Sequence, residues 1–371
     1  MSQSLNARPD RPVRVTKRRM AGFSLVELMV AVVLGLFLVI GLISLIVSNT
    51  RTRSELNKSS QQIENGRFAL QLLTEDIQHA GFTGTTLPRT ASTMVQVAPT
   101  PCPTTVAQLG YAAAANYAAS VPYSVSGAAA AAAAGCISNY QPGTAIVIVT
   151  RVSTSVTAAA SPIAAVTYLQ GSTCATDTTP FTIAAGSVGS GGFTRTQTNC
   201  VAAATLRTVI QRMYFVSSCN ACSPSDNVPT LKVAEYVNGA MQITPLVEGI
   251  QDMQVEYGID MDNNGSPDCY TSNPANPPAA EIAAAVCPQT SPLYDWTVSV
   301  PNVAANWSNV VTVRVHVLAK NNDISGGWTD TRSYDMGLGE GTVGPFNDQY
   351  KRHAYSAVVR LYNIAGQREL Q

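Results

Sequence analysis

The stretch that decides the fold runs from Leu28 to Val47 and reads LMVAVVLGLFLVIGLISLIV. It has no charged residue over 20 positions, and an α-helix of that length measures about 30 Å, the thickness of one hydrocarbon core. An ordinary secretory signal would end in a small-residue cleavage site, but the residues that follow are SNTRTRSEL. The run therefore predicts a membrane-spanning helix that stays in the protein.

The segment before this run is basic, although the whole chain has a formal net charge of zero. Residues 1–22 contain six Lys or Arg side chains and one Asp, a net charge of +5, so the remainder carries −5. Lys and Arg are retained on the cytoplasmic side of membrane segments. The arm therefore predicts a cytoplasmic N-terminus. Nucleic-acid binding is the alternative interpretation of a basic arm, and the apolar run that follows at once argues against it.

Between the arm and the run stands the string GFSLVE, from Gly22 to Glu27. The order of basic leader, GFSLVE and apolar helix resembles the prepilin signal of type IV pilins and pseudopilins. The resemblance implies that residues 1–22 are a leader, removed by a prepilin peptidase that cuts between Gly22 and Phe23. It further implies that Phe23 becomes an N-methylated first residue and that Glu27 becomes the fifth.

Glu27 is a carboxylate at the edge of a predicted membrane helix, where an unpaired charge is unfavourable unless it finds a partner or is neutralised. The resemblance supplies a partner, the amino terminus of a neighbouring subunit, which the cut before Phe23 creates. The alternative is a simple single-pass anchor with Glu27 among the lipid headgroups. That alternative leaves the GFSLVE string unexplained.

Beyond the membrane, apolar residues recur at a spacing that predicts a one-sided helix. They are Leu56, Ile63, Leu70, Leu73, Ile77 and Ala80. Gly81 is a suitable stop, so Phe23 to Ala80 are predicted to form one helix. Residues 23–50 form its transmembrane or pilus-core part, and residues 51–82 form an amphipathic continuation whose apolar stripe packs on a globular head.

The rest of the chain divides by composition. Residues 83–204 are rich in Ala, Thr, Ser, Gly and Pro and predict a variable, loop-rich insertion with one strand, at 145–152. Residues 205–371 predict a β-sheet head, with a hairpin at Asn238-Gly239, because both residues tolerate positive φ. Apolar and polar residues alternate from Val311 to Leu318, and residues 355–362 form the last expected strand.

These elements predict an α+β fold, a long N-terminal helix packed on an antiparallel sheet. The second half also resembles the PilW branch of the pilin family. The strings that carry this resemblance are GRFALQLLTEDIQHAGFTG (66–84), PLVEGIQDMQVEYGID (245–260), NVVTVRVHVLAKN (309–321) and KRHAYSAVVRLYN (351–363). Residues 85–204 carry little of it.

Cysteine content indicates an oxidising compartment, as does a charged fraction of only 12%. The chain has eight cysteines, at positions 102, 136, 174, 200, 219, 222, 269 and 287. Pairing each with its neighbour is the simplest of the many possible arrangements, giving Cys102 with Cys136, Cys174 with Cys200, Cys219 with Cys222, and Cys269 with Cys287. The CxxC at 219–222 allows a redox or zinc site as the alternative, but no second pair accompanies it.

One acidic string resembles the first part of a calcium-binding loop. Oxygen-bearing side chains stand at positions 1, 3, 5 and 9, with glycine at position 6. These candidate calcium ligands are Asp260, Asp262, Asn264 and Asp268. Position 12 is Thr271 instead of the usual glutamate. A site here would therefore bind calcium more weakly or take its last ligand from elsewhere in the chain. The alternative interpretation is a polar turn after a strand.

Function follows mainly from the resemblance. We find no nucleophile motif, phosphate-binding glycine loop or HExxH string, and we expect no enzyme and no cofactor beyond calcium. The resemblance implies a minor pilin that lies in the inner membrane with a periplasmic head and then enters a pilus. It also implies roles in twitching motility, adhesion and DNA uptake, although no nucleic-acid partner is evident.

The partners that the resemblance implies are other minor and major pilins, the prepilin peptidase, the inner-membrane assembly platform and the lipid bilayer. Two alternatives stay open from the sequence. One is a pseudopilin of type II secretion, which shares the same signal and head class. The other is a membrane-anchored, calcium-dependent adhesin or binding protein that never enters a fibre.

Overall fold

The computed structural model describes residues 22, 24–84, 94–186, 192–278, 280–281, 287, 290–291, 294–295 and 300–369. The chain forms two compact units, the first ending at Leu56 and the second beginning at Asn57. The leader up to Ala21 and the predicted first mature residue, Phe23, lie outside the described residues.

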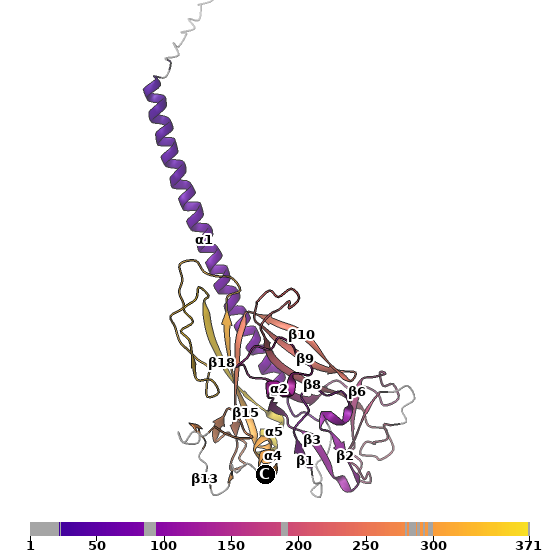
Figure 1. The fold of residues 1–371 in the computed structure, drawn as a ribbon. Helices are drawn as coiled ribbons and strands as arrows, with labels where there is room; N and C mark the ends of the chain where they lie inside the picture. Colours follow the sequence, from indigo (N-terminus) through magenta and orange to yellow (C-terminus); the bar gives the residue numbers. More distant parts are fainter. Residues whose placement is uncertain are drawn as a thin grey trace, which may run out of the picture. The chain divides into compact units, whose positions relative to one another are not determined.

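Helix α1 runs without interruption from Leu25 to Gln78, a length of 54 residues (Figure 1). The long helix predicted from the apolar run is therefore confirmed. The chain leaves the helix at Gly81, where φ is +73° and a Cβ atom would lie 2.4 Å from the Ser124 hydroxyl. Only glycine meets both conditions, which confirms the predicted stop.

The side of α1 that packs on the head is only partly the predicted one. Leu73, Ile77 and Ala80 are fully buried, as expected. Leu56 and Ile63 are 64% and 45% exposed, so their predicted burial is wrong. A seven-residue spacing drifts by about 20° per repeat around a straight helix, which carries these two positions off the buried ridge. Their places in that ridge are taken by Gln62, Gly66 and Ala69.

Among the residues that the structure describes, the head contains three sheets of three or more strands. The largest has the order β10-β9-β8-β5-β4, with β6 paired to β8 and β7 to β6. Its strands are β4 (Val125–Gly127), β5 (Val147–Val152), β6 (Thr167–Gly171), β7 (Phe181–Ala185), β8 (Leu206–Ser217), β9 (Thr230–Val237) and β10 (Ala240–Glu248). The turn between β9 and β10 is Asn238-Gly239, with positive φ at both residues, so the predicted hairpin is confirmed.

The second sheet is antiparallel and has the order β12-β11-β15-β18. Its strands are β11 (Ile250–Ile259), β12 (Cys269–Thr271), β15 (Val310–Lys320) and β18 (Arg352–Arg360). A small sheet, β1-β3-β2, is formed by β1 (Met94–Val97), β2 (Ala112–Ala113) and β3 (Ala119–Pro122). The short elements are η1 (Val106–Leu109), η2 (Ala115–Tyr117), α2 (Ala130–Ala133), α4 (Val300–Ser308), α5 (Tyr362–Arg368), and the two-residue strands β13 (Thr290–Ser291), β14 (Tyr294–Asp295), β16 (Tyr334–Asp335) and β17 (Thr342–Val343).

Two predictions about the strands need correction. Residues 83–204 were expected to be loops around one strand, yet they supply β1 to β7, and β5 and β6 pair directly with β8. In β15 the polar side of the alternation is also buried, with Thr312 and His316 6% and 8% exposed. That side lies against Tyr270, whose hydroxyl accepts a hydrogen bond from Thr312, and near Gly337 before β17.

The structure joins the eight cysteines in the near-neighbour arrangement. The disulfides are Cys102–Cys136, Cys174–Cys200, Cys219–Cys222 and Cys269–Cys287. Two of the four lie within the segment 83–204. They close loops in a part of the head whose strands have six residues or fewer, where a cross-link restricts the unfolded chain.

A buried carboxylate ties α1 to the large sheet. Asp76 is 5% exposed, and its Oδ1 lies 2.9 Å from Arg151 Nη2 and 3.1 Å from Arg212 Nη1. Its Oδ2 accepts a hydrogen bond of 2.7 Å from the Tyr214 hydroxyl. Burial and the Asp76 charge raise the pKa of Tyr214, so the hydroxyl stays a donor.

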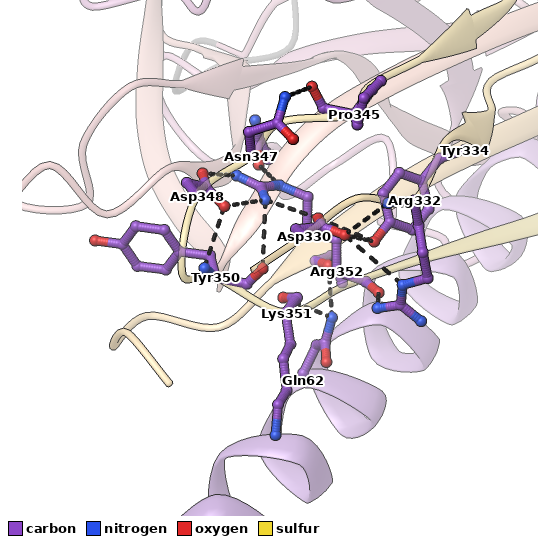
Figure 2. Close-up of polar contacts among 12 residues, drawn as sticks. Gln62, Asp330, Arg332, Tyr334, Pro345, Asn347, Asp348, Tyr350, Lys351 and Arg352 are labelled. Atoms are coloured by element: carbon purple, nitrogen blue, oxygen red, sulfur yellow. Dashed lines mark hydrogen bonds and ion pairs between the residues drawn. The ribbon is translucent and has the colours of Figure 1, made fainter. Parts of the chain in front are cut away.

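A second polar network holds the connection between β15 and β18. Figure 2 shows Arg352 between two carboxylates, with Nη1 2.9 Å from Asp330 Oδ2 and Nη2 2.5 Å from Asp348 Oδ2. Hydrogen bonds from Arg352 lower the pKa of Asp348. From α1, the Gln62 amide donates to the Lys351 carbonyl at 3.1 Å, which fixes the helix beside the start of β18.

The segment between β16 and β17 is attached to β11 by hydrogen bonds that involve two carboxyl groups, Asp252 and Glu340. The Gln254 amide donates to Asp252 Oδ1 at 3.0 Å and to Glu340 Oε2 at 2.8 Å. Burial, and then the hydrogen bond and charge of Glu340, raise the pKa of Asp252 to about 8. One proton is thereby retained between two carboxyl groups that come from distant parts of the chain.

Replacing Asp76 by alanine should lower the free energy of unfolding by about 3 kcal/mol, because two arginines and a tyrosine would lose their common acceptor. Urea unfolding of the full chain in detergent measures this loss. Glu75→Ala is the matched control, since Glu75 is the exposed neighbour on the same helix. Equal unfolding midpoints for the two variants would show that Asp76 does not tie the helix to the sheet.

The head should become less stable as pH rises from about 4, where an unfolded Asp titrates, to about 8, the folded pKa of Asp252. In this window the folded chain binds more protons than the unfolded one, so its stability falls with increasing pH. Melting curves at pH 5 and pH 8 test this. Asp252→Asn should reduce the difference, whereas the exposed Asp323→Asn should leave it intact. A difference that survives Asp252→Asn contradicts the assignment.

Candidate functional site

The first candidate site is the exposed apolar surface of the first unit. Every Leu, Ile, Val, Met and Phe side chain from Leu25 to Val47 is at least 44% exposed. The helix is long and apolar enough in this part to span a membrane, and none of that part is buried within the protein. So large a continuous apolar surface requires a lipid or protein environment.

Glu27 lies in the first turn of this helix and takes part in its start. Its Oε2 accepts a hydrogen bond of 3.3 Å from the Ser24 backbone N–H. In return, the Ser24 hydroxyl lies 3.4 Å from the Glu27 backbone N–H. This is a capping box, in which a serine and a glutamate three residues apart each bond the other's backbone.

The capping box adds a residue that the sequence analysis did not single out. Ser24 sets the helix start, and the Ser-x-x-Glu pattern before an apolar run is the signal that would have found it. The negative charge of Glu27 also lies at the positive end of the helix dipole. Of the predicted cleavage pair, Gly22 is described and Phe23 is not.

The second candidate site is the acidic loop after β11. Carboxylate oxygens of Asp260, Asp262 and Asp268 lie within 4.8 Å of one another, so the structure gathers three of the four predicted ligands. The side chain of the fourth, Asn264, is engaged in hydrogen bonds within the loop. Its amide donates to Asp262 Oδ2 at 2.9 Å, and its Oδ1 accepts from the Ser266 N–H at 2.8 Å.

Asp260, the most buried of these carboxylates at 1% exposure, already has several partners. Its oxygens accept hydrogen bonds from the backbone N–H groups of Asn264 and Gly265, at 3.1 and 3.0 Å. Arg368 of α5 also lies 3.1 Å from Asp260 Oδ2. A cation in this loop would share Asp260 with a guanidinium group, and calcium binding stays a prediction.

The histidines His79 and His316 lie apart from these two sites. His79 is exposed just beyond α1, with Nδ1 2.7 Å from the Glu75 carbonyl. His316 is buried on β15, with Nε2 3.3 Å from Glu256 Oε1. Arg314 also contacts Glu256, at 2.7 Å. These side chains form structural contacts within the helix end and the second sheet.

Calcium binding predicts that millimolar calcium raises the melting temperature of the full chain in detergent, because a ligand that binds only the folded state stabilises it. Asp262→Asn together with Asp268→Asn should remove the rise. Asp323→Asn, at an exposed position outside the loop, should not. A melting temperature that calcium leaves unchanged would retire the calcium site and leave a polar turn closed by Arg368.

Comparison with known proteins addresses both ends of the chain. Residues 213–363 match the family model of Type IV Pilus-assembly protein W, and residues 17–43 match the prokaryotic N-terminal methylation motif. Among solved structures the chain is similar to the type IV-like pilin TTHA1219 from Thermus thermophilus, at 17% identity over 43% of this chain and 70% of that one, with a TM-score of 0.24. Comparison with curated proteins found no match.

Proposed function

We propose that this chain is a PilW-like minor pilin of type IV pilus assembly and that it acts by docking its N-terminal helix into a pilus, not by catalysis. The observation that carries the proposal is the apolar surface from Leu25 to Val47, which is exposed along its whole length and interrupted by one carboxylate, Glu27. The methylation motif covers this same region, at residues 17–43.

The apolar helix suits two environments in succession. In the bilayer its side chains contact lipid, and in a pilus they contact the helices of neighbouring subunits. Lipid tails and leucine side chains are about equally apolar, so the transfer gains little from the hydrophobic effect alone. We infer that the pilus machinery, through the inner-membrane platform and a cytoplasmic motor, supplies the work of extraction.

The Glu27 carboxylate limits burial of the helix to positions where a positive charge lies opposite it. A prepilin peptidase that cuts between Gly22 and Phe23 would create an ammonium group at the N-terminus of each subunit. The Glu27 carboxylate of one subunit and the ammonium group of its neighbour would neutralise each other inside the helix bundle, where either charge alone is unfavourable. The capping box with Ser24 holds the carboxylate in the first helical turn.

This assignment includes an orientation and a set of partners. In this proposal the N-terminus lies in the cytoplasm and the head in the periplasm, because basic segments such as residues 1–22 are retained on the cytoplasmic side. The partners are the prepilin peptidase, other minor and major pilins, the assembly platform and the bilayer. The match to the pilus-assembly family at 213–363 favours this function over a type II secretion pseudopilin.

Glu27→Ala should remove the chain from sheared pili while leaving its amount in the membrane fraction unchanged. Glu27→Gln should behave alike, because it keeps the shape and loses the charge. Glu64→Ala is the control, an exposed glutamate farther along the same helix. Immunoblots of pili and membranes measure both pools. Normal amounts of the Glu27 variants in pili would contradict pairing of this carboxylate, whereas a wild-type chain found only in the membrane fraction would favour an anchored adhesin.

A further inference from the structure

Strand β18 is the last strand of the second sheet. It pairs with β15 over its whole length, from Lys320 opposite Arg352 to Thr312 opposite Arg360, and the register does not shift. The sheet order places only β15 beside it. One long edge of β18 is therefore left without a neighbouring strand among the described residues.

The direction of the backbone groups along this edge follows from two hydrogen bonds. The Leu361 N–H donates to the Val311 carbonyl, and the Asn321 N–H donates to the Lys351 carbonyl. Residues of an antiparallel strand alternate between facing the partner and facing away. Odd-numbered residues of β18 therefore face β15, and the N–H and C=O groups of Ala354, Ser356 and Val358 point outward.

The beginning of the edge is covered and the rest is open. The Arg352 carbonyl accepts a hydrogen bond of 3.1 Å from Arg332 Nη2, within the network of Figure 2. Beyond it, the structure gives the outward backbone groups of Ala354, Ser356 and Val358 no partner among the residues that it describes. Ser356 is exposed and Val358 is 56% exposed.

Three other end strands have features that usually prevent strand addition. In β10, Pro245 lacks an N–H group, and the register shifts between Pro245 and Val247. Strands β4 and β12 have only three residues each. Proline, bulges and short edge strands all block pairing with another chain. Nine-residue β18 has none of these features and is longer than β7, a five-residue end strand that pairs only with β6, so its edge is suited to a partner.

We propose that the β18 edge at residues 354–358 binds an extended segment of another pilin-class subunit, which adds a strand to the second sheet. Only an extended polypeptide presents donors and acceptors at the spacing of these outward groups. This inference rests on the proposed function, because the partner is a subunit of the same assembly. The proposed contact lies on the head and is separate from docking through the N-terminal helix.

The direction of the helix argues that the partner is a different subunit. Gln62 contacts the Lys351 carbonyl before β18, and Asn363 after β18 donates to the Ala80 carbonyl at 3.1 Å. Helix α1 and strand β18 therefore run in the same direction within the head. Antiparallel pairing of two β18 strands would point residues 57–78 of the two copies in opposite directions, whereas two copies assembled into one pilus would share one orientation.

Photo-crosslinking in the native host tests the edge in the full chain. A photoreactive residue in place of Ser356 should crosslink a subunit that carries a prepilin signal, identified by mass spectrometry. Adding Val358→Lys should lower the yield about tenfold, because a lysine on an edge strand opposes strand addition. Val201→Lys is the matched control, since Val201 is 85% exposed on a loop and gains the same charge.

Ser356→Pro, tested with the photoreactive residue in place of Ala354, provides a second variant. Proline removes one outward N–H group and leaves the ladder to β15 intact, so this variant should also lose the crosslink. A crosslink only to a second copy of this chain, no crosslink, or a yield that Val358→Lys leaves unchanged would overturn the proposal. The same experiment also measures whether the wild-type chain is present in sheared pili. If it is present, a negative crosslinking result rules out only the proposed contact at the β18 edge. If it is absent, the proposed function itself is contradicted.

Discussion

The constraint on which the rest depends is the apolar run from Leu28 to Val47. Its side chains are unfavourable in water, and in lipid a single segment satisfies all of its own backbone N–H and C=O groups only as a helix. A chain of this kind must leave the membrane as a helix, and α1 does continue to Gln78 without a break. The head is thus built on the end of a helix whose first part is committed to lipid or to other subunits.

The second half of α1 attaches to the head through a mixed surface. Leu73 and Ile77 supply apolar contact, while Gln62 and Asp76 supply directed hydrogen bonds to the second sheet and the large sheet. Gly66 lets the helix approach Tyr355, because a Cβ atom there would lie 2.3 Å from its ring. Polar ties of this kind specify one position of the helix along the sheets, where an apolar stripe alone would permit sliding.

The sequence predicted the elements whose signals are local. The long helix, its stop at Gly81 and the Asn238-Gly239 hairpin each depend on adjacent residues, and the GFSLVE string identified the candidate assembly site. Burial of Asp76 could not be predicted from local sequence. Its partners Arg151, Arg212 and Tyr214 come from strands that are distant in the chain. Of the strands in residues 83–204, only the one at 145–152 was predicted. The others were missed because each is short, and one of them, β6, forms by pairing with the distant strand β8. The acidic loop was identified from the sequence, but the contact of its Asp260 with Arg368 of α5 was not.

The account joins one exposed apolar helix, one carboxylate in its first turn and one head with an open strand edge. In the proposed function, all three act once the chain is matured and assembled beside other subunits. The most direct measurement is the intact mass and N-terminal sequence of the chain isolated from its own membranes and pili. The account predicts a chain that begins at an N-methylated Phe23. A mature protein that retains Met1 and the leader would contradict it.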